Sequence, residues 1–125
     1  KLVICGELTI NAKKLRKTSI GTQKWVTIEE KPSSAEVVTQ LKKQGYQIAA
    51  IELCQTSISY LTADYTLPIA FVLGSEKKGV SDDVIALADL LIDIPMFGMG
   101  NSMNVSSAGA IVVADCIAKL NTGSN

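Results

Sequence analysis

The sequence predicts an α/β domain with a parallel β-sheet covered by helices. Hydrophobic residues make up 47% of the 125 residues and charged residues only 19%, a balance that favours a folded core over disorder. Short apolar runs alternate along the chain with helical patterns, which is the order that parallel sheets produce. The sequence has no internal repeat and no linker, so we expect a single domain over residues 1–125.

The first strand is expected at the very start of the chain, over residues 1–5, and Gly6 ends it. Because a domain rarely starts inside a strand, we expect further residues upstream, so that the sequence is truncated at its N-terminus. A polar and basic loop is expected over 7–22. Strand-forming residues in partial alternation then predict a short strand over 23–28.

The clearest helix pattern starts at Ser33. Ser33 and Glu36 have the spacing of a capping box, an apolar stripe follows, and Gly45 provides a stop. A strand is expected next, over 46–53. The segment 55–67 is polar and has no clear period, so we expect an irregular connection there.

The last part of the chain predicts two strands and two helices. The continuous apolar run over 69–73 predicts a central strand. Ser81 precedes two aspartates and is expected to cap a short helix. A strand over 90–94, a loop over 95–103 and a helix over 104–120 complete the chain. This last helix is apolar on more than one face, so we expect it to pack on its sheet and on a second copy of the chain.

The residue inventory excludes several classes of function. The chain has no histidine, which rules out His-based catalytic triads and most zinc sites. Cys5, Cys54 and Cys116 are far apart in sequence and form no Cys-x-x-Cys pair, so we expect three buried, reduced thiols and no metal site. No apolar run approaches the ~18 residues of a membrane span, and we expect a cytoplasmic protein with no membrane partner.

Two segments follow expected strands and have an unusual composition, and ligands of open α/β sheets bind beyond the carboxyl ends of strands. In the first, over 72–81, the strand runs into Gly74, Gly79 follows five residues later, and Glu76 lies between them. Glycine permits positive φ and lets a ligand approach the backbone closely. The alternative is a tight strand-to-helix turn with an exposed glutamate.

The second segment, over 94–107, is a long glycine-rich loop that leads into the last helix. Backbone N–H groups at the start of that helix could bind polar or anionic groups; the alternative is an ordinary capped helix with a small-residue packing face. The loop does not match a dinucleotide fingerprint, because Met103 stands where glycine or alanine is required. A P-loop is also excluded, since Gly-Lys-Ser/Thr does not occur.

A run of four cations lies near the start of a chain whose net charge is zero. Its members are Lys13, Lys14, Arg16 and Lys17. The chain as a whole lacks the basic footprint of a nucleic-acid-binding protein. The run therefore either contacts nucleic-acid phosphates locally or forms a solvated loop.

Taken together, these segments resemble the SpoU-type (TrmH-like) RNA ribose 2′-O-methyltransferases of the SPOUT class. Residues 71–81 are similar to the second motif of that family, and residues 94–106 are similar to its third. The 20 residues from Gly74 to Ile94 agree with the family spacing. Met103 replaces a usual leucine, a swap that conserves volume.

The first motif of the family lies upstream of the opening strand and is absent from this sequence. That motif carries an asparagine and the arginine usually held to be catalytic. Arg16 is the only arginine here, and it lies in the basic run instead. The fragment alone would therefore be incomplete as an enzyme.

The resemblance implies a parallel-sheet SPOUT fold with a C-terminal trefoil knot, in which the segment after Ile94 threads through the loop around 74–81. It also implies S-adenosylmethionine as the cofactor and a homodimer with its active site at the interface. The implied reaction is 2′-O-methylation of a ribose in tRNA or rRNA, without a metal. The RNA-specific 2′-hydroxyl is the acceptor.

By the same resemblance, the expected site residues fall into three groups. The residues expected to hold the cofactor are Leu53, Gly74, Ile94, Met96 and Met103. The residues expected in the catalytic pocket are Glu76, Ser102 and Asn104, with the missing arginine as base or base activator. The expected RNA-binding residues are Lys13, Lys14, Arg16 and Lys17. Asn104 can also cap the last helix while it faces the pocket.

Two other functions stay open at the level of sequence. The first is a non-catalytic RNA-binding or dimerisation module with a degenerate SPOUT fold, and an upstream Asn-x-Gly motif followed by arginine would favour the enzyme over it. The second is a generic nucleotide-binding, flavodoxin-like domain, which ordinary unknotted connectivity would favour.

Overall fold

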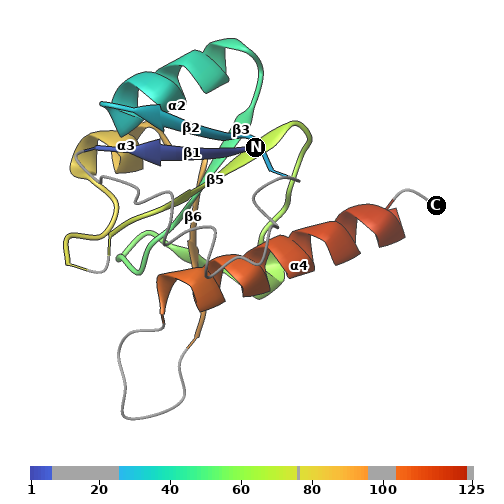
Figure 1. Ribbon diagram of the computed structural model, residues 1–125. Helices are drawn as coiled ribbons and strands as arrows, with labels where there is room; N and C mark the ends of the chain where they lie inside the picture. Colours follow the sequence, from blue (N-terminus) through green and yellow to red (C-terminus); the bar gives the residue numbers. More distant parts are fainter. Residues whose placement is uncertain (7–25, 76, 96–103, 124–125) are drawn as a thin grey trace, which may run out of the picture. The chain divides into compact units, whose positions relative to one another are not determined.

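The computed structural model describes residues 1–6, 26–75, 77–95 and 104–123 (Figure 1). The chain forms two compact units, Lys1–Val37 and Val38–Asn125. The single domain expected over 1–125 stays a prediction. The expected loop over 7–22 lies outside the described residues.

The first unit contains a parallel pair of strands, β1 (Leu2–Cys5) and β2 (Ile28–Lys31). The Gly6 N–H donates to the carbonyl of Lys31 at 3.0 Å and extends the ladder beyond β1. Of the strand expected over 23–28, the described residues 26–28 contribute only Ile28. Pairing with β1 determines which residues form the strand. These residues include charged ones, which have a low propensity for strands.

Helix α2 (Ser34–Lys43) begins and ends where the sequence predicts. The Glu36 N–H donates to the Ser33 hydroxyl at 3.3 Å, which is one half of the expected capping box. At the other end Gly45 adopts a φ of 90°. The N–H groups of Gly45 and Tyr46 both donate, at 3.0 Å, to carbonyls of the last helical turn. This pair of bonds is a Schellman motif, which ends a helix at glycine.

The second unit is built on a four-stranded parallel sheet with the strand order β4-β6-β3-β5. The strands are β3 (Gln47–Ile51), β4 (Ile58–Ser59), β5 (Ile69–Leu73) and β6 (Leu90–Asp93). The apolar run over 69–73 is a strand, as predicted, but it is an outer strand of this sheet and not a central one. An apolar run indicates that the faces of a strand are buried, and it does not indicate the position of the strand in the sheet. Strand β5 packs against the core through Ile69 and Phe71.

The connection over 55–67 contains structure that the sequence did not predict. Its residues include β4 and the 3₁₀ turn η2 (Tyr60–Thr62). The Ser59 hydroxyl accepts the N–H of Leu61 at 3.2 Å and starts this turn. Elements of two and three residues are too short to leave a period in a sequence, so the expected polar connection gave no sign of them.

Helix α3 (Asp82–Leu87) follows Ser81, as expected, but the Ser81 side chain makes no capping bond to the backbone. Its hydroxyl donates to the carboxylate of Asp83 instead. That carboxylate also accepts the N–H of Val84 at 2.9 Å. The hydrogen bond from Ser81, and then that from Val84, lower the pKa of Asp83. Ser81 is therefore the N-cap residue, as expected, and its carbonyl accepts the N–H of Ile85 at 3.0 Å. Its hydroxyl does not cap the helix, because it donates to Asp83.

The core of the second unit covers both faces of β3. Residues 48–50 are fully buried, and successive strand residues point to opposite faces. Ala49 packs in one cluster with Val112 and Cys116 of helix α4 (Val105–Gly123). Helix α3 packs against β3 as well. Strand β3 thus lies at the centre of this unit. One of its faces packs against α4, and its other face is buried as well.

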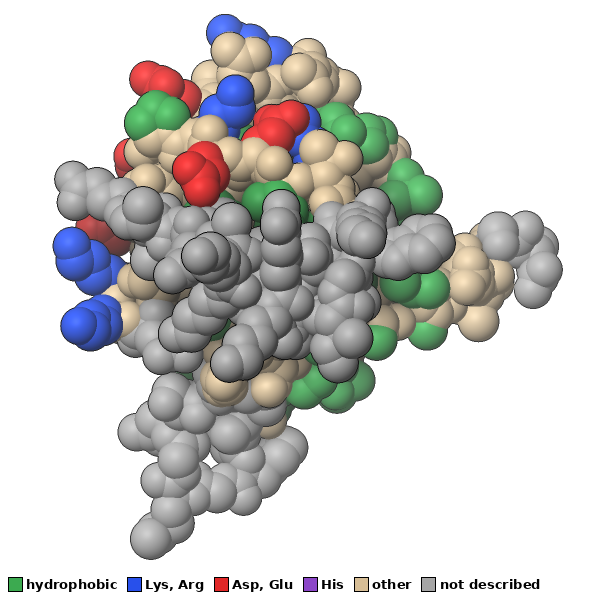
Figure 2. Space-filling model, viewed as in Figure 1, with side chains coloured by type: hydrophobic (Ala, Val, Ile, Leu, Met, Phe, Trp, Pro, Cys, Tyr) green, Lys and Arg blue, Asp and Glu red, His purple; other side chains and the backbone are tan. Residues whose placement is uncertain are grey.

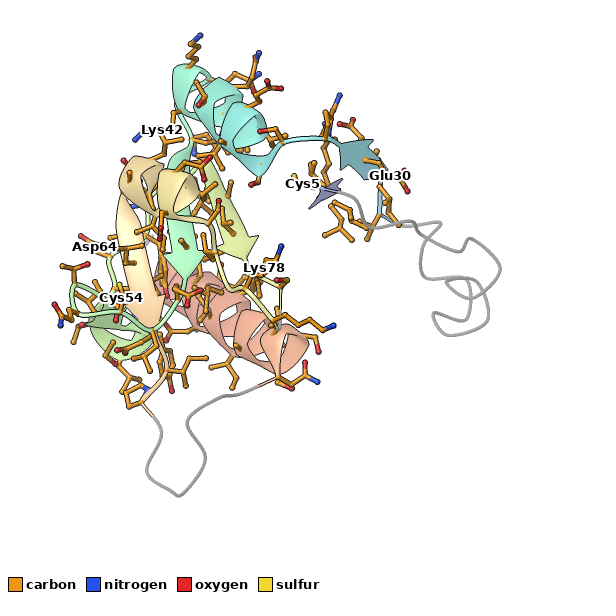
Figure 3. All side chains as sticks on the ribbon, turned by 90° about the vertical axis from the view of Figure 1, so that its left-hand side faces the viewer. Cys5, Glu30, Lys42, Cys54, Asp64 and Lys78 are labelled. Atoms are coloured by element: carbon orange, nitrogen blue, oxygen red, sulfur yellow. The ribbon has the colours of Figure 1, made fainter. Side chains whose placement is uncertain are left out.

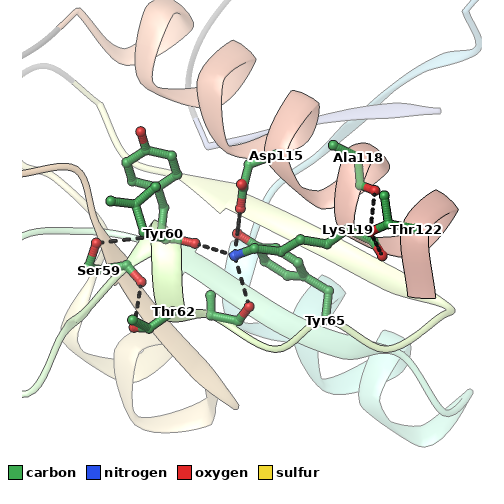
Figure 4. A network of polar contacts seen from close by, with 10 residues as sticks. Ser59, Tyr60, Thr62, Tyr65, Asp115, Ala118, Lys119 and Thr122 are labelled. Carbon is green, nitrogen blue, oxygen red and sulfur yellow. Dashed lines mark hydrogen bonds and ion pairs between the residues drawn. The ribbon is translucent and has the colours of Figure 1, made fainter.

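The C-terminal half of α4 is attached to η2 through Lys119 (Figure 4). The Lys119 ammonium donates to the carbonyls of Tyr60 at 2.7 Å and Ala63 at 3.1 Å. It also pairs with the carboxylate of Asp115 at 2.8 Å. The Tyr65 hydroxyl donates to the same carboxylate at 3.4 Å, and the ammonium lies 5.1 Å from the centre of the Tyr65 ring. These contacts fix one end of the helix against the 60–65 segment.

The outer face of α4 exposes apolar side chains, and Figure 2 shows hydrophobic surface over and beside this helix. Val113 is 38% exposed and Ile117 is 55% exposed, and Ala110 and Ala114 are exposed too. The helix is therefore apolar on more than one face, as predicted. It ends at Gly123, three residues later than expected. The expected second copy of the chain on this face stays a prediction.

The three cysteines are free thiols. Cys116 is buried, but Cys5 and Cys54 are only partly buried, so the expectation of three buried thiols is wrong for these two. Both lie at or just beyond the end of a strand, where chain cover is thinner. Among the described residues there is no cluster of ligating side chains for a metal ion. No helix in the described ranges has the length and apolar character to cross a membrane.

Candidate functional site

The carboxyl ends of β3, β5 and β6 lie side by side at one edge of the sheet. Ile51 is paired with Leu73 of β5 on one side and with Ile92 of β6 on the other. The next residues along these strands include Leu53, Gly74 and Ile94, so three of the expected cofactor-binding residues come from adjacent strand ends. In Figure 3, Cys54 and Lys78 lie toward this edge and Lys42 toward the opposite one.

Leu53 and Ile94 differ in exposure. Leu53 is 68% exposed, which is high for a large apolar side chain directly after a buried strand. Ile94 is partly buried and packs against the core cluster. An exposed leucine at a strand end can cover a flat apolar ligand surface, whereas Ile94 connects the edge to the core.

Gly74 is required because the chain crosses itself there. A Cβ at this position would lie 2.0 Å from the carbonyl carbon of Gly79 and 2.3 Å from the nitrogen of Val80. The sequence predicted a close approach to the backbone at Gly74, and that approach is present. The group that lies close to Gly74 is the chain's own backbone, and the expected approach of a ligand stays a prediction.

The turn after β5, described at Gly74, Ser75 and 77–80, is closed by its own hydrogen bonds. The Gly79 N–H donates to the Ser75 carbonyl at 2.9 Å, and the Lys78 N–H donates to the Ser75 hydroxyl at 3.0 Å. Gly79 adopts a φ of 67°, a left-handed conformation that favours glycine. Steric constraints thus explain why both positions of this turn are glycine. The turn presents a fixed backbone surface at the sheet edge.

Glu52 is a residue of this edge that the sequence analysis missed. Its carboxylate Oε2 accepts the N–H of Val80 at 2.9 Å and so connects the end of β3 to the turn after β5. The backbone N–H of Glu52 donates to the carbonyl of Ile92 at 3.0 Å. The only signal in the sequence is a charged residue between Ile51 and Leu53 at the end of an apolar strand.

A second turn, over 54–57, lies beyond β3 and was also missed. The Ser57 hydroxyl accepts the N–H of Cys54 at 3.2 Å and lies 2.7 Å from the Cys54 carbonyl. It also lies 3.1 Å from the Asp93 carboxylate at the end of β6. Hydrogen bonds from the Thr56 hydroxyl and then its backbone lower the pKa of the Cys54 thiol. This turn directly follows Leu53 in the sequence.

Asn104 caps helix α4, as predicted. Its side-chain Oδ1 accepts the Ser106 N–H at 2.9 Å and the Ser106 hydroxyl at 2.8 Å. Among the described residues, both bonds of this cap are accepted by Oδ1 of the amide. Farther along the helix, a Cβ at Gly109 would lie 2.9 Å from Leu73 Cδ2, so α4 packs closely on the end of β5. Small residues at the start of this helix are expected to allow close packing, and at Gly109 the close neighbour is Leu73.

The other expected site residues lie outside the described residues. They are Glu76, Met96, Ser102 and Met103, together with Lys13, Lys14, Arg16 and Lys17. Their roles stay predictions. The same holds for the expected meeting of the segments 74–81 and 94–104 in one pocket.

Comparison with known proteins gives a family match over most of the chain. A model described as the SpoU rRNA Methylase family matches residues 1–114. The tRNA (guanosine(18)-2′-O)-methyltransferase of Thermus thermophilus is 42% identical over 96 residues, which are 77% of this chain and 50% of that protein. The chain thus spans about half the length of the curated relatives it matches.

Two solved structures agree with this match. The Aquifex aeolicus TrmH/SpoU tRNA modifying enzyme has a TM-score of 0.79 at 32% identity, over 98% of this chain and 64% of that one. The AdoMet-bound rRNA methyltransferase of Sinorhizobium meliloti has a TM-score of 0.78 at 25% identity, over 90% of this chain and 43% of that one.

Proposed function

The chain belongs to the SpoU rRNA methylase family, and from this premise we propose that it binds S-adenosylmethionine and methylates a ribose 2′-hydroxyl of a tRNA. The observation that carries the proposal is the sheet edge at which Leu53, Gly74 and Ile94 follow three adjacent strands. The Thermus thermophilus relative, whose name specifies a tRNA ribose, supports tRNA over rRNA.

The described residues fit such a cofactor. Leu53 offers exposed apolar surface for an adenine ring. The turn after β5 offers a rigid backbone with hydrogen-bonding groups, because Gly74 and Gly79 allow its tight path. The S. meliloti structure, described as AdoMet-bound, shares this fold with the chain at 25% identity. We assign Leu53, Gly74, Ile94, Met96 and Met103 to cofactor binding.

Methyl transfer requires orientation and removal of one proton. S-adenosylmethionine, when bound, supplies an electrophilic methyl group on a sulfonium. Glu76, Ser102 and Asn104 orient the ribose so that its 2′-oxygen attacks in line. The arginine of the family's first motif, which this sequence does not contain, would take the hydroxyl proton or activate the base that does so. The cofactor's S–CH₃ bond would break as the O–CH₃ bond forms, S-adenosylhomocysteine would be the leaving group, and the hydroxyl proton would go to that base.

Three finer features are part of the proposal. Lys13, Lys14, Arg16 and Lys17 contact the phosphates of the RNA. The segment after Ile94 threads through the loop 74–81 as a trefoil knot, as the family resemblance implies. Two copies associate through the exposed apolar face of α4, which Ala110, Val113, Ala114 and Ile117 supply.

The test is a methyl-transfer assay with the whole protein, labelled S-adenosylmethionine and either total tRNA or rRNA. Label is expected in tRNA at a 2′-O-methyl nucleotide. Asn104→Ala is expected to cut single-turnover transfer by about 10²-fold or more if Asn104 orients the ribose, but to cost only about 1 kcal/mol of stability as a lost helix cap. Label in rRNA alone would overturn the choice of tRNA, and no label in either RNA would overturn the activity.

A further inference from the structure

We propose that Glu52 is a positioning residue for the cofactor: its carboxylate holds the turn after β5 in the shape that binds S-adenosylmethionine. The inference rests on the proposed function, because it concerns the same sheet edge. The property of Glu52 that matters is the length of its side chain, which lets it accept a hydrogen bond from the turn. Its negative charge is not required.

The contact between Glu52 and the turn is close at two points. Oε2 accepts the N–H of Val80 at 2.9 Å, and Val80 is buried. A Cβ at Gly79 would lie 2.8 Å from the same oxygen. Gly79 therefore serves two purposes, since it adopts positive φ and leaves room for the carboxylate. A buried N–H that loses its acceptor is costly, so this bond selects one path of the backbone through 79–80.

Glu52 is itself anchored from the opposite side. Its backbone N–H donates to the carbonyl of Ile92 at 3.0 Å, which continues the pairing of β3 with β6 by one residue. Strand β3 lies between β6 and β5. One residue thus connects the ends of three strands, with its backbone bonded toward β6 and its side chain bonded toward the turn after β5.

This geometry connects the Glu52 carboxylate to the cofactor-binding residues. The backbone of 79–80 lies directly against Gly74, so a shift of Val80 changes the space at Gly74. Leu53 is the residue next to Glu52, and its backbone shares the same strand end. When the carboxylate releases Val80, the expected result is a change in the relative placement of Leu53 and Gly74, two of the residues assigned to cofactor binding.

Three substitutions separate the effect of the length of the Glu52 side chain from the effect of its charge. Glu52→Gln keeps an oxygen at the same distance and removes the charge. Glu52→Asp keeps the charge, but its carboxylate is one methylene too short for the bond to Val80. Glu52→Ala removes both. The matched control is Asp89→Ala, because the Asp89 carboxylate also accepts a backbone N–H, that of Ile48 at 2.8 Å, but from the amino-terminal half of β3.

The experiment is calorimetric titration of the whole protein with S-adenosylmethionine, with the melting temperature measured for each variant. We expect Glu52→Asp and Glu52→Ala to raise the Kd by about tenfold, the loss of one hydrogen bond to a charged group. Glu52→Gln is expected to stay within about threefold of wild type. Asp89→Ala is expected to lower the melting temperature and leave the Kd unchanged.

Two results would overturn the inference. One is wild-type affinity in folded Glu52→Asp and Glu52→Ala. The other is a Gln variant as weak as the Ala variant beside a tight Asp variant, which would assign the effect to charge. Wild-type protein that is folded and binds no S-adenosylmethionine would instead contradict the proposed function, so the two failures are distinguishable.

Discussion

At the scale of single residues, the glycines of the site are explained by the chain's own backbone. Gly74 and Gly79 attract notice in the sequence as places where a ligand could approach. The structure gives each a local reason, since Gly74 lies against the backbone of 79–80 and Gly79 has positive φ beside Glu52. A binding surface can therefore require glycine without the ligand touching it, because the turn must first fold over itself.

Gly74→Ala is expected to destabilise the protein by about 3 kcal/mol or more, because the new Cβ would overlap backbone atoms that have no room to move. Gly123→Ala is the matched control, since nothing lies within 4 Å of a Cβ there, and it is expected to change stability by less than about 0.5 kcal/mol. Urea unfolding measures both. Equal stability of the two variants would contradict the crossing at Gly74.

Tyr65 provides a pH-dependent contribution to stability. Burial, and then the carboxylate of Asp115, raise its pKa from 10.0 to about 12. The folded state therefore holds the phenol proton more tightly than the unfolded state. This contribution is complete below pH 10 and is lost as the pH rises toward 12, by up to about 1.4 kcal/mol per pH unit.

Tyr65→Phe removes this titration. The unfolding free energy of wild type is expected to fall more steeply than that of the variant between pH 10 and pH 12. Tyrosinate absorbance is expected to lose a step near pH 12 in the variant. Parallel pH profiles for the two proteins would show that Tyr65 titrates normally.

At the scale of elements, the sequence was most informative where a local rule acts. The helix Ser34–Lys43 has its cap and its glycine stop within its own residues, and β5 has an unbroken apolar run over 69–73. By contrast, β2 depends on pairing with β1, and the η2 turn depends on Lys119, which is 59 residues away from Tyr60. Such long-range partners leave no pattern in the local sequence.

The same reasoning separates the site residues that were predicted from those that were missed. Leu53, Gly74 and Ile94 follow strands, so their meeting at one edge is predictable from a parallel sheet. The partner of Glu52 is Val80, 28 residues later, and the partner of Ser57 is Asp93, 36 residues later. No spacing rule connects those pairs, so only the fold reveals them.

Lys119→Met tests how α4 is held. The substitution removes the hydrogen bonds to Tyr60 and Ala63 and the ion pair with Asp115, and it is expected to cost about 2 kcal/mol, because bonds from charged groups to partly buried acceptors are among the stronger ones. The control is Lys43→Met on an exposed position of α2, expected within about 0.5 kcal/mol of wild type. Similar unfolding curves for the two variants would mean that the Lys119 contacts contribute nothing.

At the scale of the whole molecule, the exposed apolar face of α4 concerns assembly. Ile117 is 55% exposed on a helix whose other face is buried in the core. We expect Ile117→Glu to dissociate the proposed dimer, because a charge would be desolvated in an apolar contact. Leu61→Glu is the control, since Leu61 is 61% exposed but lies outside α4. Sedimentation velocity at micromolar concentration distinguishes the states, and a wild-type monomer or an unaffected Ile117→Glu dimer would exclude this interface.

The activity that we propose is methylation of a ribose in tRNA. The most direct measurement is mass-spectrometric mapping of ribose methylation in RNA from cells with and without the gene that encodes this chain. The proposal predicts that one 2′-O-methyl nucleotide in tRNA disappears on deletion and returns when the intact gene is restored, but not with the Asn104→Ala gene. An unchanged set of 2′-O-methyl nucleotides in tRNA would contradict it.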